Sequence, residues 1–172
     1  ASHARLPSPI LSIFFILSCG MTLVILTQGI DLSVAAVVAL ARVLSAQSLG
    51  IAGSSPLVAL LVGIGVGLAF GLVNGLLVVY AHIEPFLVTL GTMSMARGAA
   101  LLFARGSVVP VRNDRFVSLF SDGTLAGIPL LILYSALIFA LLFTMLRTTR
   151  LGRNIYAVGG NPTAAVLSGI RV

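Results

Sequence analysis

The sequence predicts an all-α, polytopic transmembrane helical bundle with about five spans, and three observations support this fold class. Hydrophobic residues make up 59% of the 172 residues, and the mean hydropathy is +1.18. Charged residues make up 8%, whereas soluble domains carry about 25%. The apolar residues are gathered in stretches long enough for membrane helices, which need roughly 20 mostly apolar residues. Lipid is therefore expected to surround much of the chain.

Five stretches satisfy this length and composition in chain order. They are Ile10 to about Leu26, Leu32 to about Leu49, Pro56 to about Tyr80, Pro85 to about Ala104, and Ile128 to about Leu146. The second and fourth contain Arg42 and Arg97, and a charge at a helix centre costs about 2.5–3.5 kcal/mol on insertion scales. Each guanidinium group is expected to reach the interface or to pack between helices. Because the chain begins with Ala1 and stops just after a basic segment, we expect a fragment of a longer protein.

Two longer connections predict the orientation in the membrane. The loop 105–127 carries Arg105, Arg112 and Arg115 beside Asp114 and Asp122, and the tail 147–172 carries Arg147, Arg150, Arg153 and Arg171 without an acid. Arg near span ends is retained on the cytoplasmic side. The tail residues lie closer to a firm span, so the tail is expected in the cytoplasm and the loop outside.

The charged residues exclude several function classes. All ten basic residues are Arg, and they are scattered without interleaved aromatics, which disfavours nucleic acid as a partner. The chain has no Lys and hence no Lys-bearing phosphate loop, so ATP-driven work requires a separate subunit. We expect a protein that is not an enzyme and that has no cofactor, metal site or catalytic residue.

A glycine row marks the third span. Gly63, Gly67, Gly71 and Gly75 recur every four residues and share one helix face. Small residues at this spacing allow close approach of another membrane helix. We predict a packing face.

Polar residues occur in three of the apolar regions. Asp31 and Ser33 lie between the first two spans, where either could cap the next helix, or the carboxylate could lie beside a solute path. Thr89, Thr92 and Ser94 in the fourth span could line a path or could join helices. Ser94 shares its face with Gly91, Met95 and Gly98. With Asn74, these residues are the candidates for a translocation path: Asp31, Ser33, Asn74, Thr89, Thr92 and Ser94.

The tail predicts a short capped helix. Gly159 and Gly160 are expected to break the chain, after which Asn161 caps a helix that begins with Pro162 and is closed by Gly169. Such an element could fill a groove in a partner protein.

Four segments in sequence resemble the ribose-type (simple sugar) ABC importer permease subunits, a family of binding-protein-dependent inner-membrane transport components. The segments are Gly20–Ser33 (GMTLVILTQGIDLS), Gly71–Gly75 (GLVNG), Pro85–Met93 (PFLVTLGTM) with Ala96–Gly98, and Thr149–Ile170 in the tail. Arg42 departs from the small or weakly polar residue expected there. The resemblance implies that residues 1–172 are the N-terminal part of one permease domain without its first helix and its C-terminal half.

The resemblance also implies a function, in which the subunit passes a ribose- or xylose-like monosaccharide through the bacterial inner membrane. Its implied partners are an ABC ATPase subunit, an extracytoplasmic sugar-binding protein, a second permease subunit and membrane lipid. Residues 147–172 would be the cytoplasmic coupling loop, with these residues facing the ATPase: Arg150, Gly152, Arg153, Gly159, Gly160, Asn161, Pro162, Ala164, Ala165 and Gly169. The alternatives are a permease for an autoinducer, a nucleoside or a branched-chain amino acid, or an ion-coupled secondary carrier.

Overall fold

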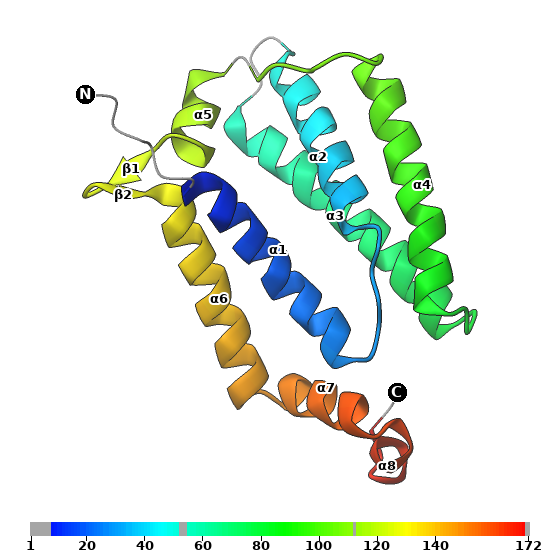
Figure 1. Ribbon diagram of the computed structural model, residues 1–172. Coiled ribbons are helices and arrows are strands. Elements are labelled where there is room, and N and C mark those ends of the chain that lie inside the picture. The colour runs from blue at the N-terminus through cyan, green and yellow to red at the C-terminus, as the bar shows by residue number, and fades with distance from the viewer. Residues whose placement is uncertain (1–7, 52–54, 112, 171–172) are drawn as a thin grey trace. The chain divides into compact units, whose positions relative to one another are not determined.

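The structure, a computed structural model, describes residues 8–51, 55–111 and 113–170. It divides into two compact units: residues 30–117 form a three-helix unit, and the segments up to residue 29 and from residue 118 form a two-segment unit. The elements in chain order are α1 (Ser8–Leu26), α2 (Val34–Leu49), α3 (Pro56–Val79), α4 (Pro85–Ala104), α5 (Asp114–Phe120), β1 (Thr124–Leu125), β2 (Ile128–Pro129), α6 (Leu130–Thr148), α7 (Arg150–Gly160) and α8 (Pro162–Leu167) (Figure 1).

The three-helix unit alternates in direction. Ser45, late in α2, donates a hydrogen bond of 2.8 Å to the carbonyl of Ala59, early in α3, so these helices run antiparallel. Gln47, late in α2, donates to the carbonyl of Phe103, late in α4, so α2 and α4 run parallel. Each helix of this unit therefore reverses the direction of the one before it, as successive membrane crossings do.

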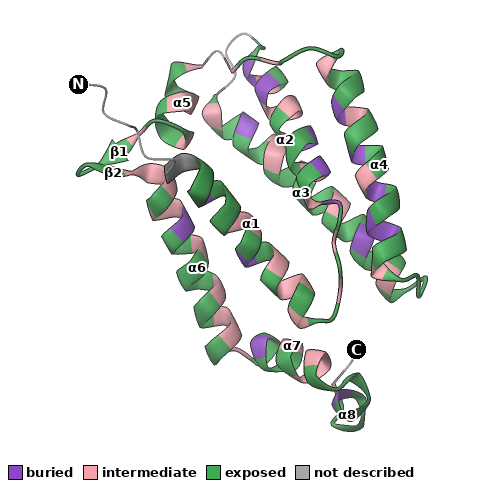
Figure 2. Ribbon diagram, in the orientation of Figure 1, coloured by how far each residue is buried: buried purple, intermediate pink, exposed green. Residues whose placement is uncertain are grey.

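Small side chains bring α2 and α4 together. Ala36 and Leu40 of α2 are buried in one cluster with Ala96 and Ala100 of α4, and Figure 2 shows buried positions recurring along both helices. Alanine at a helix contact lets two backbones approach closely, which is how membrane helices associate. The buried cluster of this unit thus contains alanine from both α2 and α4.

Among the described residues, the predicted glycine face of α3 has a close neighbour only at Gly63. A methyl group at Gly63 would lie 3.0 Å from the Ser45 hydroxyl, whereas one at Gly67, Gly71 or Gly75 would meet no described atom within 4 Å. That Gly67, Gly71 and Gly75 pack against another helix therefore stays a prediction.

The two-segment unit joins the first and the last long helices. The ring of Phe15 in α1 lies 5.7 Å from the ring of Phe139 in α6, and Gly159 of α7, beyond the end of α6, lies against Leu26 at the end of α1. The middle of α1 thus meets the middle of α6, and Leu11 of early α1 lines a common groove with Ile132 of early α6. The two helices therefore run parallel, as Figure 1 shows. A first and a fifth crossing must have the same direction, and α1 and α6 do.

All five predicted spans are helices. Among the described residues, α3, α4 and α6 are long and apolar enough to cross a membrane, and Ile10–Leu26 and Val34–Leu49 are shorter apolar helices. The multi-pass helical fold class is confirmed. Arg42 and Arg97 are exposed, and neither side chain has a hydrogen bond or an ion pair with another described residue.

Three local expectations need correction. Gly159 and Gly160 do not break the chain, because both belong to α7. The loop 105–127 holds α5 and β1, and its hairpin turns at Ala126 and Gly127, whose φ angles of 51° and 81° suit a two-residue turn. Ile128 pairs in β2, so the last long helix begins at Leu130. Arg112 and Arg171, which entered the prediction of orientation, lie outside the described residues.

Candidate functional site

A polar cluster forms where the chain enters α2. One carboxylate oxygen of Asp31 accepts hydrogen bonds from the backbone N–H of Ser33 at 2.7 Å and from the Ser33 hydroxyl at 2.6 Å. The Asn74 amide of α3 donates to the same hydroxyl at 3.2 Å. The structure therefore brings three predicted path residues into one hydrogen-bonded chain, which we call the polar cluster (Asp31, Ser33 and Asn74).

The predicted helix cap has a different geometry. Ser33 occupies the N-cap position of α2, yet its side chain accepts no hydrogen bond from the helix. The Asp31 carboxylate instead stabilises the turn before the helix by binding Ser33. Ser33 is at the predicted N-cap position, but the predicted hydrogen bond from the side chain of Asp31 or Ser33 to the backbone of α2 is wrong.

Asn74 is left with an unsatisfied oxygen. Its side chain is buried, and its Oδ1 has no hydrogen-bond donor in the described structure. Rotating the amide cannot remedy this, because the Ser33 hydroxyl already donates its single hydrogen to Asp31. A buried amide group without a partner is costly. Asn74 Oδ1 is thus a free acceptor within a network that already contains a carboxylate.

The three predicted path residues of α4 differ in their contacts. Thr89 is buried at the start of α4, with its hydroxyl 2.8 Å from the Pro85 carbonyl of its own helix and 3.2 Å from the carbonyl of Ile30, next to Asp31. Thr92 is buried and bonds only within α4. Ser94 is exposed and bonds to the Leu90 carbonyl. Thr89 therefore touches the linker that carries the polar cluster, and the other two do not.

The short tail helix is built as the sequence predicts. The Asn161 side chain accepts a hydrogen bond from the Ala164 N–H at 3.0 Å, and Pro162 occupies the first turn of α8. At the other end Gly169 has a φ of 80°, and the N–H of Ile170 bonds to the carbonyl of Ala165 at 3.0 Å. These bonds satisfy the backbone groups left open at both helix ends.

The corner between α6 and α7 is tight. The Thr149 hydroxyl donates to the Met145 carbonyl at 2.6 Å and accepts from the Gly152 N–H at 3.2 Å, so it closes one helix and caps the next. A methyl group at Gly152 would collide with the Leu146 backbone. The orientation of α7 on α6 therefore requires glycine at position 152.

A second close approach ties α7 to α1. A methyl group at Gly159 would collide with the Leu26 carbonyl oxygen. The Gln28 side-chain amide donates to the Gly159 carbonyl at 2.8 Å. Gln28 itself has a φ of 63° and ends α1 in a left-handed turn, with the Gly29 N–H bonded to the Val24 carbonyl. The sequence did not single out Gln28, because nothing in its local pattern signals a partner 131 residues away.

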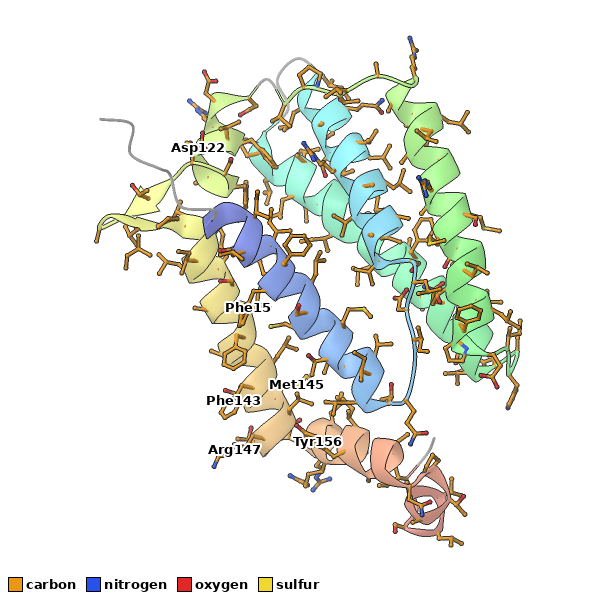
Figure 3. All side chains as sticks on the ribbon, in the orientation of Figure 1. Phe15, Asp122, Phe143, Met145, Arg147 and Tyr156 are labelled. Atoms are coloured by element: carbon orange, nitrogen blue, oxygen red, sulfur yellow. The ribbon has the colours of Figure 1, made fainter. Side chains whose placement is uncertain are left out.

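Large apolar side chains of α7 and α8 are exposed. Leu151 and Tyr156 of α7 and Val166 and Leu167 of α8 are all more than half exposed. Arg150 and Arg153 are exposed beside them. Apolar groups rimmed by charge are typical of protein interaction surfaces. Figure 3 shows Tyr156 on α7, beside the end of α6 that carries Arg147.

The comparisons with known proteins agree with these features. The family described as "Branched-chain amino acid transport system / permease component" matches residues 10–172. The ribose import permease protein of Bacillus subtilis is 39% identical over 158 residues, which cover 91% of this chain and 49% of that protein. The D-allose transport system permease protein of Escherichia coli is 38% identical (94% of this chain, 49% of that protein). The galactofuranose transporter permease protein of Escherichia coli is 41% identical (90% and 45%).

The chain spans about half the length of these relatives. No solved structure matches it. The resemblance seen in the four sequence segments is confirmed, and the apolar helices agree with a multi-pass membrane protein. By its match over residues 10–172, the chain belongs to the branched-chain amino acid transport system / permease component family.

Proposed function

We propose that this chain is part of the membrane-spanning permease subunit of a bacterial ABC importer for a monosaccharide. The observation that carries the proposal is that relatives of 38–41% identity, matched along nearly the whole chain, are named as permeases for ribose, allose and galactofuranose. The subunit would lie in the bacterial inner membrane. It would hydrolyse no ATP itself, and it would work with an ATPase subunit, a sugar-binding protein and a second permease subunit.

The tail segment 147–172 is the proposed docking site for the ATPase. The exposed apolar residues of α7 and α8 and the neighbouring Arg150 and Arg153 support this role. Gly152 and Gly159 hold α7 closely against α6 and α1. A force applied to α7 would therefore act on α1 through the Gln28–Gly159 hydrogen bond.

The polar cluster is the proposed contact for the solute. The Asp31 carboxylate and the free Asn74 Oδ1 are hydrogen-bond acceptors, and the hydroxyl groups of a sugar are donors that could satisfy them. Thr89 would help to hold the linker in place through the Ile30 carbonyl. Thr92 and Ser94 have bonds within α4, and they remain weaker candidates.

The full subunit, reconstituted with its ATPase and binding protein in proteoliposomes, tests the function. We expect ATP-dependent uptake of one of three labelled sugars (ribose, allose or galactose) and no uptake of leucine. Uptake of leucine alone would favour the amino-acid role that the family description states. Uptake driven by an ion gradient without the ATPase would identify a secondary carrier and refute the proposal.

A conservative change at Gln28 tests the coupling. Asn tolerates the left-handed backbone of this position, but its shorter side chain cannot reach the Gly159 carbonyl. Gln28→Asn should leave ATPase binding unchanged and lower the amount of sugar moved per ATP hydrolysed. Equal coupling in the variant and the parent would contradict this role of Gln28.

A further inference from the structure

A groove between α1 and α6 has features of a lipid site. Its volume is about 440 Å³, and it is lined by Leu11, Ser12 and Phe15 of α1 and by Ile132, Ser135 and Phe139 of α6. The Ser135 hydroxyl donates to the Ile132 carbonyl of its own helix at 2.8 Å, so it adds little polarity to the groove. An apolar chain is the occupant that such a surface suits.

An aromatic row extends from the groove along one face of α6. The Phe15 ring meets the Phe139 ring at 5.7 Å, and the Phe139 ring stacks on the Phe143 ring at 6.0 Å. The Arg147 guanidinium group lies 5.7 Å from the centre of the Phe143 ring. Positions 139, 143 and 147 follow one another at four-residue spacing and share a helix face. The row therefore leads from the groove to a cation (Figure 3).

Among the described residues of this unit, charge is concentrated at that end. Arg147, Arg150 and Arg153 lie at the corner of α6 and α7, and Asp122 is the only side-chain carboxylate among the described residues of the unit. Asp122 precedes α6 and so lies toward the opposite end of that helix. The corner is thus complementary to an anionic group.

The spacing fits one lipid molecule. At 1.5 Å per residue, Ser135 and Phe139 lie about 18 and about 12 Å along the helix from Arg147. The hydrocarbon of one leaflet is about 15 Å deep, half of a bilayer core. An acyl chain can therefore occupy the groove while its headgroup phosphate lies at Arg147.

We propose that the groove and the Arg147 corner together bind one anionic phospholipid. The acyl chain packs on Phe15, Phe139 and Phe143, and the phosphate pairs with Arg147, with Arg150 and Arg153 close by. This proposal does not depend on the solute that the subunit transports.

Native mass spectrometry of the delipidated full subunit, titrated with dioleoylphosphatidylglycerol or dioleoylphosphatidylcholine, tests the site. Because each Arg near a membrane surface contributes about fivefold to the binding of anionic lipid, we expect phosphatidylglycerol to bind at least about fivefold more tightly. Arg147→Gln should remove about fivefold of this preference and leave phosphatidylcholine binding unchanged. Arg105→Gln, which removes a charge outside this unit, is the matched control and should change neither.

A second pair of variants tests the acyl chain. Ala136 lines the groove, and Ala136→Phe should fill it and weaken the binding of both lipids. Leu137→Phe adds bulk at the next, exposed position outside the lining and should have no effect. If Ala136→Phe does not fold, as judged by its elution profile, Ala136→Leu provides a smaller change in the same direction.

Four outcomes would overturn the proposal. The two lipids could bind with equal affinity, or Ala136→Phe could behave as Leu137→Phe does. Inorganic phosphate could displace phosphatidylglycerol at equal concentration, which would identify a site for a small anion alone. Finally, Ala136→Cys in a Cys19→Ser background could resist a lipid-soluble maleimide in the delipidated subunit, which would show that other parts of the protein cover the groove.

Discussion

Replacing Gly159 with alanine should separate α7 from the end of α1. The added methyl group would collide with the Leu26 carbonyl oxygen, which belongs to the backbone and cannot rotate away. Overpacking of this kind costs about 1–3 kcal/mol. The resulting shift would also break the Gln28–Gly159 hydrogen bond of 2.8 Å, a net loss of about 0.5–1.5 kcal/mol. Because alanine has a helix propensity about 1 kcal/mol more favourable than glycine, we expect the free energy of unfolding to fall by about 0.5–3.5 kcal/mol in total.

The neighbouring glycine provides the control. Gly160 is also helical, and a methyl group there would meet no described atom within 4 Å. Gly160→Ala should therefore be neutral or slightly stabilising. The assay is the melting temperature of the full subunit in nanodiscs, combined with the ratio of sugar transported to ATP hydrolysed. Equal effects of Gly159→Ala and Gly160→Ala on both quantities would refute the close contact with Leu26.

Three further predictions concern the polar cluster and the tail. Asn74→Leu removes the amide together with its unpaired oxygen. It should therefore lower the free energy of unfolding by less than about 1.5 kcal/mol and yet lower sugar uptake several-fold. A loss of stability above about 3 kcal/mol would mean that a donor satisfies this oxygen in the assembled transporter. Thr89→Val should weaken the attachment of α4 to the linker by about 0.5–1.5 kcal/mol, whereas Thr92→Val, which loses bonds within its own helix only, should lower the melting temperature less. Asn161→Ala should cost α8 about 1 kcal/mol of capping energy and weaken ATPase binding in a pull-down. Asn113→Ala removes a similar bond to the Phe116 N–H outside the tail and should leave ATPase binding unchanged, so equal binding by both variants would argue against α8 as a docking element.

The spans were predictable because their signal is local. α3, α4 and α6 are continuous apolar stretches that length and hydropathy alone identify, and α1 and α2 are shorter apolar helices. The cap and closure of α8 were predictable for a similar reason, since Asn161, Pro162 and Gly169 each act on the backbone of their nearest neighbours.

Contacts between distant segments were harder to predict. The low helix propensity of glycine predicts a helix break at Gly159. In the structure Gly159 is helical, and because it has no side chain it can lie against Leu26. Packing therefore outweighs the intrinsic propensity at this position. The glycine row predicts a packing face on α3, whereas the buried cluster of the three-helix unit contains Ala36 of α2 and Ala96 of α4. Alanine is common in all helices, so only the structure distinguishes an alanine at a contact from any other.

The residues of the polar cluster could be predicted from the sequence, but the hydrogen bonds between them could not. The local sequence indicates that Asp31 or Ser33 could cap a helix, and it places Asn74 in an apolar span without indicating a partner. Only the fold places the Asn74 amide on the Ser33 hydroxyl. Once Ser33 is committed to Asp31, the free Asn74 oxygen follows by counting donors.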